Sequence, residues 1–108
     1  MRKRSEKAEK KVEERKKEQQ IMHSVFMDIW KARPHHSEIS RRWLGEEPLT
    51  IFFHHILPKS KYPLAKFDPE NIILLTFDEH SKVESDMYVF EEINKRRELL
   101  NEKYCRNI

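Results

Sequence analysis

The chain has 108 residues, enough for one compact domain, and its charged residues (38%) slightly outnumber its hydrophobic ones (37%). It contains no run of about 18 apolar residues, and no apolar segment follows its basic start, so we expect neither a membrane-spanning helix nor a secretory signal peptide. Cys105 is the single cysteine, which excludes an internal disulfide framework and a cysteine-based zinc site and favours a reducing, cytoplasmic location.

Residues 1–20 form a charged leader with nine Lys or Arg residues against five Glu, a local net charge of +4, whereas the whole chain carries +3. No Gly or Pro interrupts this leader, and Glu13 precedes Lys17 by four positions, an order and spacing that support a helix. We predict a solvated helical leader. The alternative is a basic arm that binds a phosphate backbone, but the interspersed glutamates weaken it. The remaining residues, 21–108, are predicted to form the functional domain.

The charge pattern gives way to an apolar helical face after the leader. Apolar residues recur there at spacings of three and four, namely Ile21, Met22, Val25, Phe26, Ile29 and Trp30. This periodicity predicts an amphipathic helix whose apolar face belongs to the core. We expect the helix to end near Ala32, because Pro34 disfavours helical geometry at Arg33.

Two short strands are predicted in the middle of the chain. Residues 49–53 (LTIFF) are rich in β-branched and aromatic side chains and lead directly into residues 54–58 (HHILP). A polar loop over 59–69 follows, with prolines near both ends, and residues 71–76 (NIILLT) form a second strand-like run. The predicted class is therefore α+β.

One last helix is predicted to begin after Asp78. Its apolar positions are Val83, Met87, Phe90, Ile93, Leu100 and Tyr104. They follow helical spacing and are interrupted only at the charged stretch 95–98 (KRRE).

The pair His54 and His55 is the first feature with chemical potential. Adjacent residues on a strand point to opposite sides, so only one of the two can face a given site while the strand persists. The pair could therefore divide two roles, one residue binding a metal and the other acting on water or substrate. The structural alternative is a strand end with two partly exposed imidazoles.

His80 and Glu84 form the second feature. Four positions apart on a helix, they share one face, so that an imidazole and a carboxylate could bind one cation. Such a ligand set suits Mn²⁺, Ni²⁺, Co²⁺ or Zn²⁺, and with open positions the ion can act as a Lewis acid on a phosphate. Asn71 could hold a loop or orient a histidine. Taken singly, such residues are more often a surface pair and a turn residue.

The order of these residues resembles the HNH endonuclease family. The similarity rests on HHILPKSKY and DPENIILLTFDEHSKVE, with His80 nine residues after Asn71 and Glu84 four after His80. It covers about residues 30–85 and is close to small phage-type HNH proteins. It implies a ββα-metal core, here flanked by a long N-terminal and a C-terminal helix.

The resemblance also implies a role for each residue. His54, His80 and Glu84 would bind one divalent ion, which we expect to be Mg²⁺, Mn²⁺, Ni²⁺ or Zn²⁺. His55 would be the general base that activates water, and Asn71 would stabilise the loop and orient His55. Many relatives have histidine in place of Glu84, and a carboxylate there should shift preference toward Mn²⁺ or Mg²⁺.

The reaction so implied is hydrolysis of phosphodiester bonds in DNA, by cleavage or nicking. Three lysines of the connecting loop, Lys59, Lys61 and Lys66, are candidates to bind backbone phosphates. They could equally be plain solubilising residues. The expected location is the cytoplasm, that of a host if the protein is phage-encoded, and no membrane is involved.

The sequence departs from many relatives at a structural zinc. Where those relatives have two Cys-x-x-Cys pairs, this chain has Ser37 and Ser40, then Thr76 and Glu79. Hydroxyl groups do not replace thiolates as zinc ligands at neutral pH, so we expect the structural zinc to be lost. Stability would then have to come from the flanking helices or from a partner chain.

Two alternatives to a nuclease stay open. The missing cysteines motivate a non-cleaving nucleic-acid-binding or assembly protein on an HNH scaffold. A third reading is a small helical interaction protein that uses helices at 1–32 and 81–104. If continuous, residues 1–32 would form a helix of about 48 Å, longer than such a small core can cover, so we expect a homodimer through the flanking helices.

Overall fold

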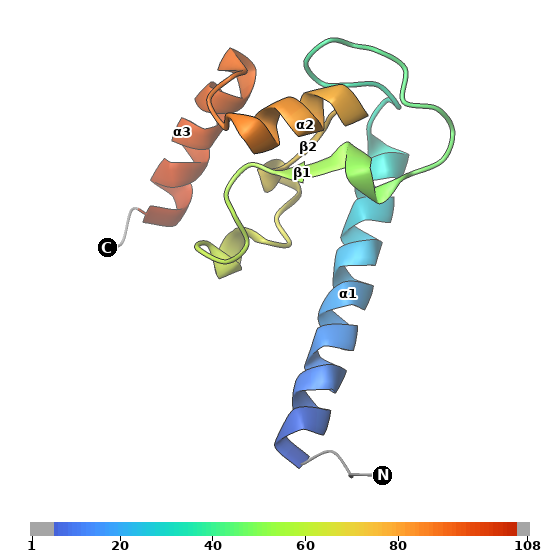
Figure 1. Ribbon diagram of the computed structural model, residues 1–108, viewed down its shortest axis with the longest axis vertical. Helices are drawn as coiled ribbons and strands as arrows, with labels where there is room; N and C mark the ends of the chain where they lie inside the picture. Colours follow the sequence, from blue (N-terminus) through green and yellow to red (C-terminus); the bar gives the residue numbers. More distant parts are fainter. Residues whose placement is uncertain (1–5, 106–108) are drawn as a thin grey trace.

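A computed structural model describes residues 6–105, and it combines three helices with a two-stranded antiparallel sheet (Figure 1). The elements in chain order are α1 (Glu6–Ala32), β1 (Phe53–His55), β2 (Ile72–Leu74), α2 (Phe77–Ser85) and α3 (Glu91–Cys105). Three single turns of 3₁₀-helix lie at 50–52, 63–65 and 69–71. The predicted α+β class is confirmed. Residues 1–5 of the leader and 106–108 of the predicted domain lie outside the described part.

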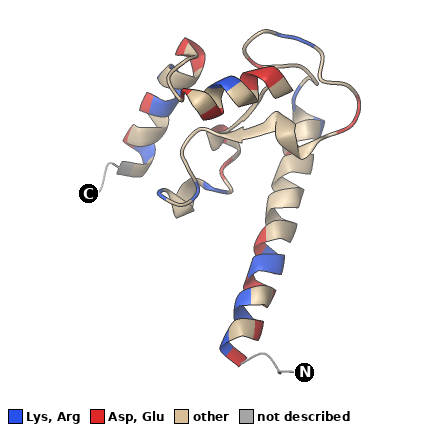
Figure 2. Cartoon of the chain, in the orientation of Figure 1, with Lys and Arg blue, Asp and Glu red and all other residues tan. Residues whose placement is uncertain are grey.

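The leader and the amphipathic segment are one helix, α1, which runs without a break across residue 20 and ends at Ala32 as expected. Ile29 and Trp30 are buried, but Ile21 is 47% exposed, so its assignment to the core is wrong. The apolar stripe begins to pack only from Met22 onward, because the charged first half of α1 extends away from the core (Figures 1 and 2). No helix in the described part is long and apolar enough to cross a membrane.

The hairpin begins later than the sequence predicts. Residues 50–52 form a 3₁₀ turn, in which the Phe52 N–H donates to the Leu49 carbonyl, and β1 covers only Phe53–His55. In β1 each residue faces a partner on β2, with His54 opposite Ile73 and His55 opposite Ile72. The two histidines therefore lie within the strand and not beyond its end.

The hairpin separates two clusters of buried side chains. The cluster shared with α1 contains Ile29, Trp30, Leu44, Phe53, Ile72 and Leu74. The cluster shared with α2 and α3 contains Ile56, Leu57, Ala65, Ile73, Leu75, Val83, Ile93 and Leu100. Successive residues of β2 enter opposite clusters, with Ile72 and Leu74 on the α1 side and Ile73 on the other, as the two-residue period of a strand requires. The hairpin is thus covered on both faces, which explains why all of β2 is buried.

The single last helix that we predicted is two helices. The chain leaves helical geometry at Asp86, whose carboxylate accepts a hydrogen bond from the Tyr88 N–H, and the Asn94 side chain donates to the Tyr88 carbonyl. These polar contacts stabilise a turn in place of a further helical turn. The change of direction lets Ile93 and Leu100 of α3 pack on the core, while the KRRE stretch lies inside α3 without interrupting it.

Asp68 ties the end of the connecting loop to α3. Its carboxylate accepts hydrogen bonds from the Glu70 N–H, from Lys103 Nζ at 2.7 Å and from the Tyr104 hydroxyl. Burial alone would raise the pKa of Asp68, but these hydrogen bonds and the charge of Lys103 outweigh burial and lower the pKa below 3.8.

The substitution Asp68→Asn is expected to lower the free energy of unfolding by about 1 kcal/mol at pH 7, a modest value because Lys103 is exposed to solvent. The ionised carboxylate stabilises the fold above its unfolded pKa, and that contribution is lost as the pH falls through the lower folded pKa. The difference in free energy of unfolding between variant and wild type should therefore stay constant above about pH 4 and shrink below it. Urea unfolding across this range tests the prediction, with the exposed Asp28→Asn as control, and parallel pH profiles for wild type and Asp68→Asn would contradict it.

Candidate metal centre

The alternation of β1 places His54 on the side of α2. Phe53 packs in the cluster next to α1 and stacks on Phe26, and the His55 ring lies 6.2 Å from the same Phe26 ring. His54, between them, points the other way and meets the His80 ring edge-on, with 5.1 Å between ring centroids. The two rings therefore leave β1 on opposite sides, as predicted, but both histidines still line one cleft, so the expectation that only one of them can face a given site is wrong.

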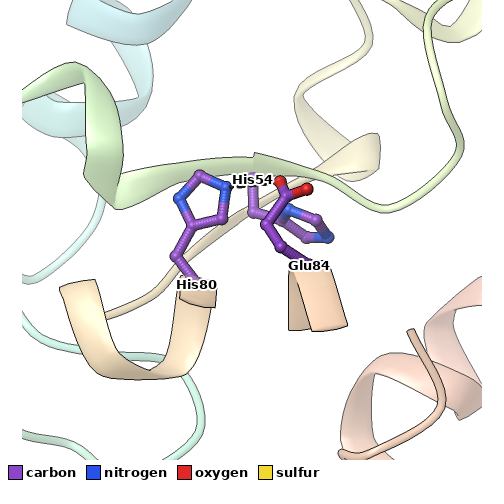
Figure 3. A group of neighbouring side chains, drawn as sticks. All are labelled: His54, His80 and Glu84. Atoms are coloured by element: carbon purple, nitrogen blue, oxygen red, sulfur yellow. Dashed lines mark hydrogen bonds and ion pairs between the residues drawn. The ribbon is translucent and has the colours of Figure 1, made fainter. Parts of the chain in front are cut away.

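Helix α2 presents its two candidate ligands to that histidine. A capping box fixes the start of α2, since the Thr76 hydroxyl accepts from the Glu79 N–H and the Glu79 carboxylate accepts from the Thr76 N–H. One helical turn then separates His80 from Glu84, and both side chains rise toward the strand that carries His54 (Figure 3). One nitrogen or oxygen atom from each of His54, His80 and Glu84 lies within 4.8 Å of the others, so the three could hold a metal ion.

The hydrogen bonds of His80 fit such an ion. Nδ1 lies 2.6 Å from the Ile51 carbonyl oxygen, which can only accept, so Nδ1 carries the proton. The neutral ring then has a lone pair on Nε2, which lies 3.1 Å from a Glu84 carboxylate oxygen. Two acceptors at that distance need a proton or a metal ion between them. Neighbouring ligands with bond lengths of about 2.1 Å are separated by similar distances.

The surroundings of His54 keep its imidazole neutral. Burial first, and then the charges of His80, His55 and Arg97, lower its pKa to about 4 against the opposing effect of Glu84. A neutral imidazole has the lone pair that a metal ligand requires. The donor set of two imidazoles and one carboxylate thus fits a divalent ion.

A backbone carbonyl holds the ring of His55 in place. Its Nε2 lies 2.9 Å from the Lys66 carbonyl oxygen, so Nε2 donates and the neutral ring has its lone pair on Nδ1. Burial lowers the pKa of His55; the hydrogen bond to Lys66 raises it, and the charge of Lys59 lowers it, with a net decrease. His55 is therefore neutral at pH 7, as a general base must be.

Asn71 does not orient His55 directly, which corrects one of our expectations. Its side chain is fully buried, where it accepts from the Leu57 N–H at 2.7 Å and donates to the carbonyl oxygens of Leu57 and Ala65 at 3.1 Å. It therefore closes the loop between the strands. Because the Lys66 carbonyl follows Ala65 in that loop, the influence of Asn71 on His55 passes through the backbone.

A cleft of about 450 Å³ joins these groups, and it is lined by His54, His55, His80 and Glu84 among others. Of the three lysines proposed from the sequence, only Lys59 lines this cleft. Lys61 is exposed elsewhere in the loop, and the Lys66 ammonium lies 2.5 Å from a Glu18 carboxylate oxygen on α1.

Sequence reasoning missed Arg97, which also lines the cleft. It occupies a buried position between Ile93 and Leu100, at the spacing of the apolar stripe of α3. An arginine at an apolar position of a helix was the available signal, and it lay inside the KRRE stretch that we interpreted as an interruption.

Hydrogen bonds bring together Ser37, Ser40, Thr76 and Glu79, the four positions compared above with zinc-binding cysteines. Glu79 and Ser37 are buried, and the Ser37 hydroxyl also accepts from the N–H groups of Ile39 and Ser40. Burial alone would raise the pKa of Glu79, but hydrogen bonds from Ser37, Ser40 and Thr76 lower it. A carboxylate surrounded by donors thus links the loop near residue 37 to the start of α2.

No family model, curated protein or solved structure matches the chain. The residues and contacts described above are therefore the basis of the functional proposal.

Proposed function

We propose that the protein is a metal-dependent HNH-type endonuclease that hydrolyses phosphodiester bonds of DNA, with β1, β2 and α2 as its ββα-metal core. One observation carries the proposal: potential ligand atoms of His54, His80 and Glu84 converge in a cleft that His55 also lines. The order β1–β2–α2 brings together residues that are 30 positions apart at most, from His54 to Glu84.

The metal centre would consist of His54, His80 and Glu84. A divalent ion bound by these residues would act as a Lewis acid on the charge that develops at the scissile phosphate. The candidates are Mg²⁺, Mn²⁺, Ni²⁺ and Zn²⁺, and the carboxylate of Glu84 favours the harder ions.

His55 would act as the general base. Its Nδ1 takes a proton from the attacking water, and the Lys66 carbonyl keeps the other nitrogen protonated and the ring in one orientation. The same carbonyl accepts a stronger hydrogen bond once the ring becomes positively charged, which stabilises the imidazolium.

The distribution of basic residues supports an extended nucleic acid as substrate. Lys59 lines both the cleft at His54 and a second cleft of about 200 Å³. The second cleft is also lined by Lys66 and by Arg15 of α1. Lys66 is paired with Glu18 of the same cleft, so a backbone that passes from one cleft to the other would meet the charges of Lys59 and Arg15 along its path.

Metal binding is the first test of the proposal. We expect wild-type protein to bind one Mn²⁺ or Zn²⁺ ion in calorimetric titration, and His80→Ala to weaken binding by about a hundredfold or more because a ligand is lost. Glu84→Gln should weaken Mn²⁺ binding more than Zn²⁺ binding. The matched control is His23→Ala, an exposed histidine of α1. Equal affinities for wild type and His80→Ala would contradict this metal centre.

Incubation with supercoiled plasmid and each of the four metals is the second test. Nicked or linear product that requires added metal supports the nuclease. Metal binding and DNA binding without cleavage would favour a non-cleaving HNH scaffold, and absence of metal binding would favour a helical interaction protein.

A further inference from the structure

Arg97 is a buried cation without a buried anion beside it. Only 8% of the residue is exposed, and its two terminal nitrogens donate to the Asn94 side chain at 2.7 Å and to the Met87 carbonyl at 2.6 Å. Nε has no hydrogen-bond partner, and within residues 6–105 no carboxylate forms an ion pair with this guanidinium. Burying a charge in this way is unfavourable unless an opposite charge joins it.

The position of Arg97 indicates where that opposite charge would come from. It lines the cleft that contains His54 and Glu84, and Lys59 lines the same cleft. The contacts to Asn94 and Met87, together with a Tyr88 ring 5.1 Å from the guanidinium carbon, hold the group in place. The hydrogen bonds use two of the five N–H groups of an arginine. The side chain therefore has more donors than a structural contact to this turn requires.

We propose that Arg97 is an anion-binding residue of the cleft and that it holds a phosphate group of the substrate beside the ligand cluster. Guanidinium is suited to this role because its planar N–H groups match phosphate oxygens in pairs. The identity of the substrate rests on the proposed nuclease function, whereas the anion site itself does not.

Titration of wild-type protein with inorganic phosphate tests the site without any substitution. In ¹⁵N-resolved NMR spectra, the Arg97 Nε–H resonance should shift and saturate with phosphate, in the presence and absence of Mg²⁺. The Nε–H resonance of Arg42, which is exposed and does not line the cleft, is the internal reference. No shift at Arg97, or an equal shift at Arg42, would overturn the proposal.

Affinity for a 12-base-pair DNA duplex, measured with Ca²⁺ in place of a catalytic metal, gives the second readout. Arg97→Gln should weaken binding about tenfold, and Arg97→Lys, which keeps the charge but not the paired donors, should lose less. Lys95→Gln, which removes an exposed charge from the same helix, is the control. Unchanged DNA affinity in a folded Arg97→Gln variant would overturn the proposal. If the wild-type protein binds no metal, that result would overturn only the metal centre.

Discussion

Replacing His55 with alanine is expected to lower the rate of metal-dependent DNA cleavage by about 10²- to 10⁴-fold, the range typical of a lost general base. The substitution removes the nitrogen that accepts a proton from water and leaves His54, His80 and Glu84 in place. Metal affinity should therefore stay close to that of the wild type. A large decrease in rate without a decrease in metal affinity would separate the base from the ligands.

The measurement is the initial rate of nicking of supercoiled plasmid at saturating metal, together with a calorimetric metal titration of the same variant. His23→Ala serves as control, since His23 is exposed on α1, and any cleavage by a contaminating enzyme would appear unchanged in both variants. Wild-type cleavage by His55→Ala would rule out His55 as the base. Loss of metal binding in this variant would assign His55 to the metal centre instead.

The substitution Asn71→Ala is expected to have the largest effect on stability, a loss of about 3–5 kcal/mol in the free energy of unfolding. Three backbone groups, two of Leu57 and one of Ala65, would lose their partner in a site that water does not reach. Each such group has a desolvation cost of about 1–3 kcal/mol when it is unpaired.

Urea unfolding followed by circular dichroism at pH 7 measures this loss. The exposed Gln20→Ala in α1 is the control, for which we expect a change of about 0.5 kcal/mol or less. Asn71→Asp is informative because it keeps an acceptor for the Leu57 N–H but places oxygen against two carbonyl oxygens. It should also be strongly destabilising, and wild-type stability in either Asn71 variant would show that these hydrogen bonds contribute little.

Features that depend on local physical rules could be predicted from the sequence. Pro34 ends α1 where expected, because proline restricts the residue before it. The separation of His54 from His55 and the pairing of His80 with Glu84 follow from the periods of strand and helix.

Features that depend on tertiary contacts could not be predicted in this way. Apolar spacing continues through Met87 and Phe90, so nothing in the periodicity reveals the turn that Asp86 and Asn94 stabilise. The shift of β1 to Phe53–His55 depends on which residues find partners in β2, and short apolar runs leave that register open.

The candidate site also contains residues that could be predicted from the sequence and one that could not. Three of its side chains belong to residue types that are characteristic of metal binding and could be named in advance. Arg97 could not, because its burial depends on how α3 packs, and charged residues are ordinarily exposed.

The backbone carbonyl that holds His55 has a consequence for how this protein can vary. Every amino acid has that carbonyl, so the hydrogen bond to His55 places no direct restriction on which residue occupies position 66. It does restrict the length of the loop, because inserting or deleting one residue would displace the carbonyl by up to about 3.5 Å. In a library of loop variants, active members should differ freely in composition at this point and share one loop length.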